Sequence, residues 1–328
     1  MSSPMGLVPG SWDPSADDNA VLDVARAARA LGAGVHVDHP LGARTTLGVG
    51  GPARCFIEAP GPTELAGVLT SVAAHAEAAV PMLVLGRGSN LLVGDFGWPG
   101  VVVQLGAGFK WQRRDGDEVR AGGGLAMPAL AAWSATEGLA GLEFAAGIPA
   151  SVGGSVRMNA GAHHGSTADL LVDVDVATTD ATDGRAVDPR RLGFGYRCST
   201  LPPRSVVVAA RWRLRPDDPE VIRGRLDEMR AYRRQTQPLR QRNCGSVFTN
   251  PEGDSAGRLL ESAGLKGLRR GGAQVSDKHA NFIVVDPAAR AADVRGLIAE
   301  LRRAVLAAGG PLLEPEVRLV GRFEAPPS

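Results

Sequence analysis

A run of small residues between Gly141 and Ala162 restricts the possible folds of this chain more than any other feature. The segment reads GLEFAAGIPASVGGSVRMNAGA, and glycine, alanine and serine hold more than half of its positions. Packed cores need side-chain volume, so this stretch is a poor core element, whereas its bare backbone allows something large to approach closely. A dinucleotide-like cofactor bound through backbone N–H groups is the natural candidate. A series of ordinary turns is the alternative interpretation.

A second glycine-containing loop follows the short apolar run that ends at Leu85. It reads GRGSNLL from Gly86 to Leu92. Glycines permit positive φ and leave N–H groups unobstructed, so such a loop can wrap a pyrophosphate. A plain turn explains this loop about as well when it is taken alone, and the G-x-G-x-x-G fingerprint that opens a long helix is absent. The two loops together predict one large bound cofactor.

Charge and cysteine content exclude several classes of protein. Lysine plus arginine (36) nearly balance aspartate plus glutamate (35), so no global field draws the chain to nucleic acid or to an anionic membrane. The three cysteines, Cys55, Cys198 and Cys244, lack the spacing of a disulfide framework or a zinc knuckle, and the adjacent His163 and His164 are interpreted as an exposed loop, so we expect no metal. No signal peptide and no apolar run approaching ~18 residues is present. We expect a soluble cytoplasmic protein.

Apolar periodicity and turn residues predict a mixed α+β chain with a polar tail up to about Asp18. We expect helices at 21–31, after Pro62 with Thr63 as N-cap, at 127–137, after Pro219 to about 234, and at 255–263 and 288–308. We expect strands at 55–58, 82–85, 101–104, 118–121, 171–176, 206–214, 281–285 and 316–320. The polar, proline-bearing break from Arg215 to Pro219 predicts a domain boundary. The domains are therefore expected at 19–215 and 216–328, after a mobile tail at 1–18.

Seven ordered motifs make the chain similar to a known family. Between Thr45 and Gly321 they read TTLGVGGPA from Thr45, GRGSNLL from Gly86, GIPASVGGSVRMNAGA from Gly147, GYRCS from Gly195, CGSVFTNP from Cys244, AGLKG from Ala263 through NFIV from Asn281, and PEVR from Pro315. With these motifs the chain resembles the UDP-N-acetylmuramate dehydrogenase family, also called the UDP-N-acetylenolpyruvoylglucosamine reductases. The resemblance implies a bipartite FAD-binding module of the vanillyl-alcohol oxidase type, followed by a smaller α+β substrate-binding domain.

The resemblance also implies how FAD is held. No histidine lies in Gly86–Leu92 or Gly147–Ala162, so we expect FAD to be bound without a covalent link. The compact spacing between Arg197 and Ser246 is similar to the form of the family that lacks an extra tyrosine-bearing substrate loop. The positions that match cofactor contacts are Val49, Gly50, Gly86, Arg87, Gly88, Ser89, Asn90, Leu91, Gly147, Ile148, Pro149, Ser151, Val152, Gly153, Gly154, Asn159, Gly161 and Ala162.

The implied activity is a reduction in peptidoglycan precursor synthesis, and so in cell-wall formation, cell shape and division. In the family, NADPH reduces FAD, and the reduced flavin gives hydride to the enolpyruvyl β-carbon of UDP-N-acetylglucosamine enolpyruvate, which yields UDP-N-acetylmuramate. The match makes Arg197 the clamp for the substrate carboxylate, Ser246 the proton donor to the α-carbon, and Glu316 an aid to protonation. Tyr196, Asn250 and Arg318 match substrate-binding positions.

Each catalytic assignment has an ordinary alternative outside its motif. Arg197 would be a surface arginine at a strand end, Ser246 a serine that caps a turn, and Glu316 a strand-edge carboxylate paired with Arg318. The motif context favours the functional interpretation of all three.

The chain departs from the family at two positions. Relatives often carry lysine at the positions of Thr236 and Thr249. The diphosphate of the substrate therefore needs another cation, and the nearby candidates are Arg233, Arg234, Arg240 and Arg242.

Two other functions compete with this hypothesis. One is an FAD-dependent oxidase or dehydrogenase of a sugar or alcohol with the same fold, since fold alone does not secure function. The other is a nucleotide- or RNA-binding protein that uses the basic cluster around Arg233 and Arg234, where Tyr232 alone offers little aromatic stacking. We expect the small-molecule enzyme, as a monomer, with no nucleic acid or membrane partner.

Overall fold

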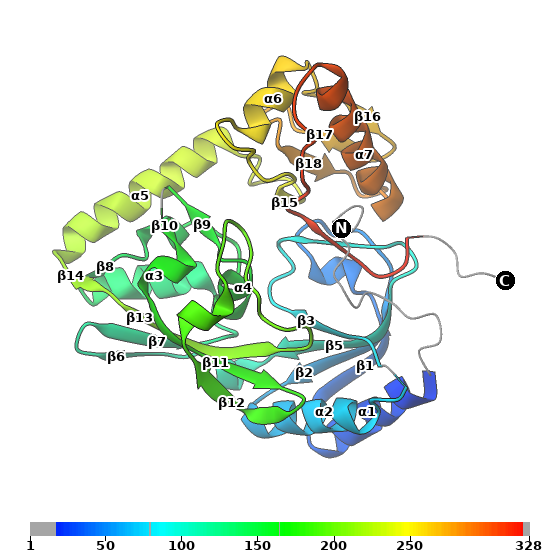
Figure 1. The fold of residues 1–328 in the computed structure, drawn as a ribbon, viewed down its shortest axis with the longest axis vertical. Helices are drawn as coiled ribbons and strands as arrows, with labels where there is room; N and C mark the ends of the chain where they lie inside the picture. Colours follow the sequence, from blue (N-terminus) through cyan, green and yellow to red (C-terminus); the bar gives the residue numbers. More distant parts are fainter. Residues whose placement is uncertain (1–17, 79, 164, 324–328) are drawn as a thin grey trace.

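The computed structural model describes residues 18–78, 80–163 and 165–323, and they form three main sheets, each accompanied by helices (Figure 1). The expected tail at 1–18 lies outside the described residues except for Asp18, which begins the first helix. The helices are α1 (Asp18–Ala30), α2 (Pro62–Ala74), α3 (Met127–Thr136), α4 (Val152–Arg157), α5 (Pro219–Thr236), α6 (Ala256–Ser262) and α7 (Ala291–Ala307).

The first sheet has the strand order β1-β2-β5-β3 and carries α1 and α2 on one face (Figure 1). Its inner strands pair in parallel and are buried on both faces, as parallel sheets require. The run Val101 to Val103 shows the alternation of a strand: Val101 and Val103 belong to the core under the two helices, whereas Val102 packs with Phe56 on the opposite face. The strands are β1 (Gly34–His39), β2 (Ala53–Ala59), β3 (Met82–Leu85) and β5 (Trp98–Leu105).

Helix α2 begins two residues earlier than the sequence suggested. Gly61 is the N-cap and Pro62 the first helical residue, so the prediction of Thr63 as N-cap was wrong. Proline suits this first position because its fixed φ is already helical and its missing N–H would have no partner inside the helix.

The second sheet is antiparallel throughout, with the order β12-β11-β13-β7-β6, and α3 and α4 lie against it (Figure 1). Trp212 of β13 is fully buried at its centre, and its indole Nε1 donates to the carbonyl of Thr167 at 3.1 Å. The strands are β6 (Gln112–Asp115), β7 (Glu118–Gly122), β11 (Leu171–Thr178), β12 (Ala181–Val187) and β13 (Val206–Arg213), with the short strands β8 (Leu139–Ala140), β9 (Gly161–Ala162), β10 (Gly165–Ser166) and β14 (Arg215–Pro216) beside them.

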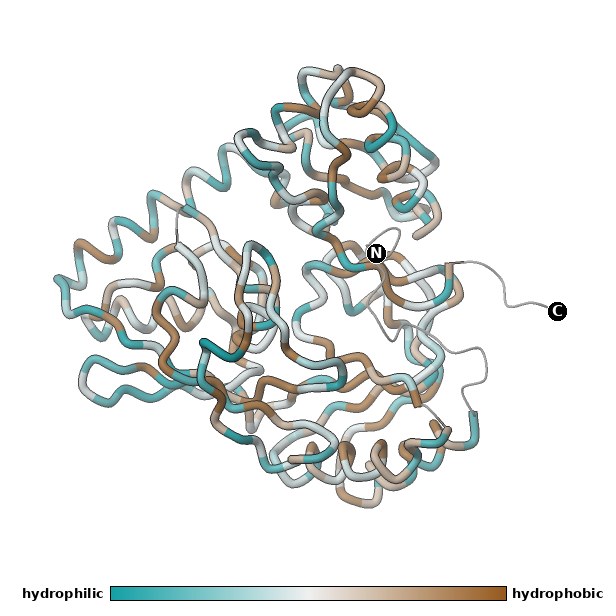
Figure 2. Tube along the Cα trace, in the orientation of Figure 1, coloured by the Kyte–Doolittle hydropathy of each residue, from teal (hydrophilic) through white to brown (hydrophobic). Residues whose placement is uncertain are grey.

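Helix α5 links the second sheet to the third. It packs on α3 through its buried residues Ile222 and Leu226, and the rest of it is mostly hydrophilic (Figure 2). At its N-terminus Asp218 caps the helix by accepting from the N–H of Glu220 at 2.8 Å. The charged helix that the sequence predicted is thus confirmed.

The third sheet has the order β15-β18-β17-β16 and packs against α6 and α7. Its core also includes Leu47, Val49 and Leu92 from the N-terminal part of the chain. After α7 the chain leaves this sheet, and β19 pairs in parallel with β4 next to the first sheet. The strands are β4 (Leu91–Val93), β15 (Asn243–Ser246), β16 (Arg269–Arg270), β17 (Ala273–Val275), β18 (Phe282–Val285) and β19 (Arg318–Val320).

The predicted elements are present, with most differences at their ends. The strand at Met82–Leu85 has the predicted bounds, whereas the helix expected from Ala288 begins at Ala291 and the strand expected from Glu316 begins at Arg318. The sequence did not indicate β1 or β12. Both are edge strands with mostly exposed or half-exposed residues, so neither has the apolar pattern on which a strand prediction depends.

Candidate active site

The two glycine loops and the Thr45 motif meet at the end of β3. A Cβ atom on Gly86 would lie 2.6 Å from the hydroxyl oxygen of Ser151, in the second loop. Gly88 has φ +63°, and a Cβ there would lie 2.6 Å from the carbonyl oxygen of Arg44. The carbonyl of Gly88 accepts from the N–H of Thr46 at 3.2 Å. Three motifs that are far apart in the sequence therefore form one continuous backbone surface.

The loop from Gly86 to Asn90 presents free backbone donors. In the described part of the chain, none of its N–H groups donates to a protein acceptor. Buried or half-buried N–H groups normally have a partner, and Gly88 is buried while Ser89 and Asn90 are partly buried. The donor set fits a ligand that brings several acceptor oxygens, such as the diphosphate and flavin carbonyls of FAD.

The second loop is held firmly against the second sheet. The N–H of Val152 donates to Leu125 O at 2.8 Å and that of Gly153 to Gly123 O at 2.9 Å. Ser151 caps α4 by accepting from the N–H of Gly154 at 3.2 Å. The hydroxyl of Ser155 is buried without a hydrogen-bond partner. This backbone is thus fixed in place before any ligand binds.

The side chains of the predicted cofactor positions differ in where they lie. Those of Val49 and Val152 are buried in hydrophobic cores, so only their backbone could face a cofactor, whereas those of Leu91 and Ile148 are half-buried and pack against such cores. Gly161 pairs with Ser166 in the β9–β10 hairpin, and Gly50 faces Val93. Arg87 and Pro149 are exposed, and Ala162 is half-buried.

Two of the candidate arginines lie on glycines of these motifs, Arg233 on one in the second glycine loop and Arg242 on one in the Thr45 motif. The side chain of Arg233 passes over Gly147, where an added Cβ atom would lie 2.4 Å from Arg233 Cδ. The side chain of Arg242 lies over Gly48, where an added Cβ atom would lie 3.1 Å from Arg242 Cδ. Burial lowers the pKa of the Arg233 guanidinium, and its Nε is buried without a partner. A buried cation without an anionic partner is unfavourable, so Arg233 suits an anionic ligand at this loop.

Arg197 lies in a tight turn of the GYRCS motif. Gly195 and Cys198 bond to each other on either side of the turn, and Arg197 has φ +59°. A non-glycine residue rarely adopts this conformation, which is found where the surrounding structure enforces it, often at functional sites. The Arg197 Cζ lies 4.8 Å from the ring centroid of Tyr196, whose side chain is exposed.

Arg197 and Glu316 form an ion pair. Arg197 Nε lies 3.3 Å from Glu316 Oε1, and the two side chains are only 22% and 16% exposed. Burial raises the pKa of Glu316 to about 7, although the guanidinium groups of Arg197 and Arg318 act in the opposite direction. Desolvation disfavours the charged carboxylate more than these cations favour it, so Glu316 can hold a proton near neutral pH.

Ser246 is brought beside Glu316 by backbone pairing. The N–H of Glu316 donates to the carbonyl of Val247, the residue after Ser246, at 2.8 Å. The buried amide of Asn281 fixes the same strand, because its Oδ1 accepts from Phe248 N at 2.9 Å and its Nδ2 donates to Phe248 O at 2.8 Å. The structure therefore places all three predicted catalytic residues in one region.

The remaining predicted residues lie around this region. Asn90 joins the first glycine loop to the C-terminal segment, since its Nδ2 donates to Glu316 O at 3.0 Å and its carbonyl accepts from Arg318 N at 3.0 Å. Asn250 is exposed, and its Oδ1 accepts from Ala256 N at the start of α6. Thr249 hydrogen-bonds the carbonyl of Glu314.

Two residues of this region were not singled out from the sequence. Asn281 carries no chemistry of its own, and only its burial against Phe248 reveals its role in positioning the strand. Arg157 could have been noticed, because it is the one charged residue between Gly147 and Ala162. Its side chain reaches the segment that follows Arg197, where it contacts the Ser205 carbonyl at 2.7 Å.

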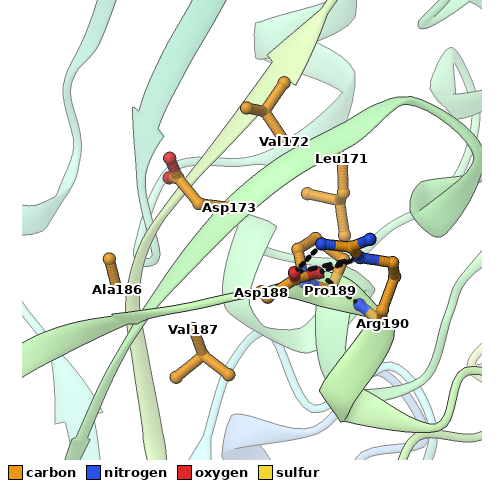
Figure 3. A pocket seen from close by; sticks show the side chains of 8 residues that line it. All are labelled: Leu171, Val172, Asp173, Ala186, Val187, Asp188, Pro189 and Arg190. Carbon is orange, nitrogen blue, oxygen red and sulfur yellow. Dashed lines mark hydrogen bonds and ion pairs between the residues drawn. The ribbon is translucent and has the colours of Figure 1, made fainter.

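A surface cavity of about 440 Å³ lies elsewhere, on β11, β12 and the turn after β12 (Figure 3). None of the predicted site residues lines it; its walls are Leu171, Val172, Asp173, Ala186, Val187, Asp188, Pro189 and Arg190. Within residues 18–78, 80–163 and 165–323, no group of three or more histidine, cysteine or acidic side chains could hold a metal ion. Over the same residues, no helix combines the length and the apolar character needed to cross a bilayer.

Known proteins resemble the chain on both sides of α5. Two family models match it: "FAD binding domain" at residues 61–185, and "UDP-N-acetylenolpyruvoylglucosamine reductase, C-terminal domain" at residues 237–320. These matches confirm the predicted fold class, an FAD-binding module followed by a smaller α+β domain.

Relatives cover most of the chain. A UDP-N-acetylenolpyruvoylglucosamine reductase of Heliobacterium modesticaldum is 45% identical over 86% of this chain and 89% of its own length, and one of Anaeromyxobacter sp. is 43% identical over 88% and 89%. The crystal structure of UDP-N-acetylenolpyruvylglucosamine reductase from Thermus caldophilus superposes with a TM-score of 0.75, at 39% identity, over 88% of this chain and 98% of that one.

Proposed function

The chain belongs to the UDP-N-acetylenolpyruvoylglucosamine reductase family, and from this membership we infer an FAD-dependent enzyme that reduces UDP-N-acetylglucosamine enolpyruvate to UDP-N-acetylmuramate with NADPH. The observation that carries the assignment to this chain's own residues is the ion pair of Arg197 and Glu316 beside the glycine loops.

FAD, when bound, takes hydride from NADPH and supplies it to the enolpyruvyl β-carbon. We propose that backbone donors of Gly86–Asn90 and the Gly147–Ala162 segment hold it, without a covalent bond. The free N–H groups of the first loop and the bare backbone of the second support this. We also propose that the FAD-binding module spans 19–215 and the substrate-binding domain 216–328.

Arg197 is proposed to bind the substrate carboxylate. A guanidinium remains charged at every relevant pH and can donate two parallel hydrogen bonds to a carboxylate. Negative charge that develops on this carboxylate after hydride arrives is stabilised by Arg197, and Arg318 adds positive charge to the same region. Tyr196, stacked on Arg197, and Asn250 are proposed to contact the rest of the substrate.

Ser246 is proposed to donate a proton to the α-carbon. A serine hydroxyl is a weak acid, so the transient alkoxide needs nearby positive charge. Arg197 and Arg318 lie close enough to Glu316 to affect its pKa, and Val247, next to Ser246, bonds the Glu316 backbone. These contacts support an environment in which the loss of the Ser246 proton is less costly.

Glu316 is proposed to aid this protonation. With a pKa of about 7, it is present in both protonated and charged forms under working conditions. Binding of a substrate carboxylate to Arg197 adds a negative charge next to Glu316, and this favours the protonated form. A protonated Glu316 can then donate a hydrogen bond or a proton near Ser246.

The assay that tests the function is NADPH oxidation with and without UDP-N-acetylglucosamine enolpyruvate. The purified protein should be yellow, with flavin released on denaturation. Turnover that depends on this substrate is the expected result, whereas a flavoprotein that ignores it and oxidises sugars or alcohols would support the competing hypothesis of an oxidase or dehydrogenase. A colourless protein that cannot be reconstituted with FAD would refute both.

We also propose that the enzyme acts in the cytoplasm, as a monomer without nucleic-acid or membrane partners. The near balance of charge supports the absence of polyanionic partners. Light scattering of the purified holoenzyme should give the mass of one chain, and a doubled mass would contradict the monomer.

A further inference from the structure

The segment Gly195–Ser205, which carries Arg197, is tied to the end of α4 at several points. Asn159 Nδ2 donates to Gly195 O at 3.0 Å. The Ser199 hydroxyl donates to the carbonyl of Arg157 at 2.7 Å. The Arg157 guanidinium reaches Ser205 at the far end of the segment. Residues at the end of α4 thus hold the beginning, the middle and the end of the Gly195–Ser205 segment.

Arg157 makes most of these contacts through one nitrogen. Nη2 lies 2.7 Å from both the carbonyl oxygen and the hydroxyl oxygen of Ser205 and 3.3 Å from Pro202 O, while Nη1 lies 3.4 Å from Leu201 O. Ser205 is buried, and its hydroxyl in turn donates to Pro202 O at 2.7 Å. A planar guanidinium with several fixed donors can join such carbonyls in one geometry.

The segment that Arg157 holds is conformationally unfavourable on its own. Arg197 has φ +59° and Arg204 has φ +61°, and such values cost free energy in non-glycine residues. They persist only where surrounding contacts enforce them. The Arg157 contacts at 201–205 and the Asn159 contact at 195 lie on either side of Arg197, where they can supply that constraint.

Arg157 also has an unusual setting for a structural arginine. It is partly buried, and no ion pair with a carboxylate is found for it in the described part of the chain. Burial lowers the pKa of its guanidinium, and Arg318 acts in the same direction. A carboxylate would stabilise this cation better than carbonyls do. The hydrogen bonds to the segment that carries Arg197 are the polar contacts that the Arg157 guanidinium makes instead.

We propose that Arg157 is a positioning residue for Arg197: it holds the Gly195–Ser205 segment against the flavin-binding α4 so that the Arg197 guanidinium stays where the substrate carboxylate binds. The inference rests on the proposed function. It predicts that the loss of Arg157 affects the substrate half-reaction and leaves the NADPH half-reaction intact.

The test compares the holoenzyme with Arg157→Met, Arg157→Lys and the control Arg114→Met. Arg114 also bonds backbone carbonyls, of Gly116 and Glu137, but it joins the β6–β7 hairpin to α3. In stopped-flow experiments, NADPH should reduce the flavin of Arg157→Met at a rate within about twofold of wild type. In steady-state assays, the KM of this variant for the enolpyruvyl substrate should rise about tenfold or more. Arg157→Lys keeps the positive charge without the planar guanidinium, so its KM for the enolpyruvyl substrate should lie between those of wild type and Arg157→Met.

A second measurement reports on the segment without catalysis. Trypsin should cleave the FAD-loaded Arg157→Met protein after Arg204 several-fold faster than wild type, because Ser205 is then no longer held. Arg114→Met should leave this rate unchanged. If Arg157→Met does not fold, Ser205→Ala removes the hydroxyl contact to Arg157, together with the hydroxyl's own bond to Pro202 O, and should show the same pattern with a smaller rise in KM.

Three outcomes would overturn the inference. They are an unchanged KM and proteolysis rate in Arg157→Met, an equal loss in both half-reactions at normal FAD content, and full recovery of both readouts by lysine, which would leave charge alone as the cause. If wild type itself does not turn over the enolpyruvyl substrate, the proposed function fails, while the proteolysis experiment still tests the positioning of the segment.

Discussion

Arg197 and Glu316 are far apart in the sequence and form an ion pair, with Arg197 Nε 3.3 Å from Glu316 Oε1. Arg197 belongs to a turn in the connection between β12 and β13 of the second sheet, and Glu316 lies just before β19, in the segment that returns from the third sheet. Because the pair joins the region of the flavin loops to the C-terminal part of the chain, a ligand that competes for Arg197 acts on both.

Substitution of Ser246 should separate the two half-reactions. In Ser246→Ala the rate of flavin reduction by NADPH should stay close to that of wild type, since no proton is needed from this residue at that stage. Reoxidation of the flavin by the enolpyruvyl substrate should slow by about 10²-fold or more, the usual size of a lost general acid. Stopped-flow absorbance of the flavin measures both rates. Equal slowing of the two would contradict the proposed role.

Glu316 should make the folded protein less stable as pH rises. Its pKa is raised from 4.5 to about 7 in the folded state, so between these values the folded protein binds more protons than the unfolded chain, and the free energy of unfolding falls as pH increases. The loss is complete above about pH 7 and amounts to roughly 3 kcal/mol. Glu316→Gln cannot ionise and should remove this contribution.

Chemical unfolding at pH 5 and pH 8 measures the effect. The wild-type protein should lose more stability between the two conditions than Glu316→Gln does, and all other groups titrate alike in both proteins. The comparison would contradict the raised pKa if the two proteins lost equal amounts, or if the variant lost more.

Gly88 should not tolerate a side chain. Gly88→Ala places a Cβ 2.6 Å from Arg44 O at a φ of +63°, so the loop must shift, at a cost of about 1–2 kcal/mol for the backbone conformation alone. We expect weaker FAD binding and a lower melting temperature. Gly224→Ala is a matched control, because it adds the same methyl group in α5 with no atom within 4 Å. FAD titration and thermal unfolding measure the two effects, and equal behaviour of the two variants would argue against a shaped loop.

Arg233 should hold an anion that the family otherwise binds through lysine. Its side chain crosses Gly147 and its buried Nε has no partner, so Arg233→Met should raise KM for the UDP-sugar about tenfold at unchanged FAD content. The exposed neighbour Arg234 provides the control, as Arg234→Met should have little effect. If FAD content falls instead while KM is unchanged, the guanidinium serves the cofactor and not the substrate diphosphate.

Local patterns were sufficient for much of the fold. The centre of β5 is a continuous apolar run from Val101 to Val103, and α5 begins at the Asp218-Pro219 pair, which is evident in the sequence. The edge strands β1 and β12 could not be found in this way, because strand pairing and not an apolar face holds them in place. The start of α2 was missed by two positions because a proline, and not the capping threonine, determined it.

The sequence by itself determined the glycine loops, the order of the motifs and the types of residue available for catalysis, because these depend on which residues occur and in what order. Only the tertiary structure decided that Arg197 meets Glu316, that Asn90 joins the first loop to the C-terminal segment, and that Arg157 braces the Arg197 segment. The raised pKa of Glu316 was also decided there. The physical reason is that desolvation and charge pairing depend on distances through space, which residues far apart in the chain acquire only when the sheets pack together.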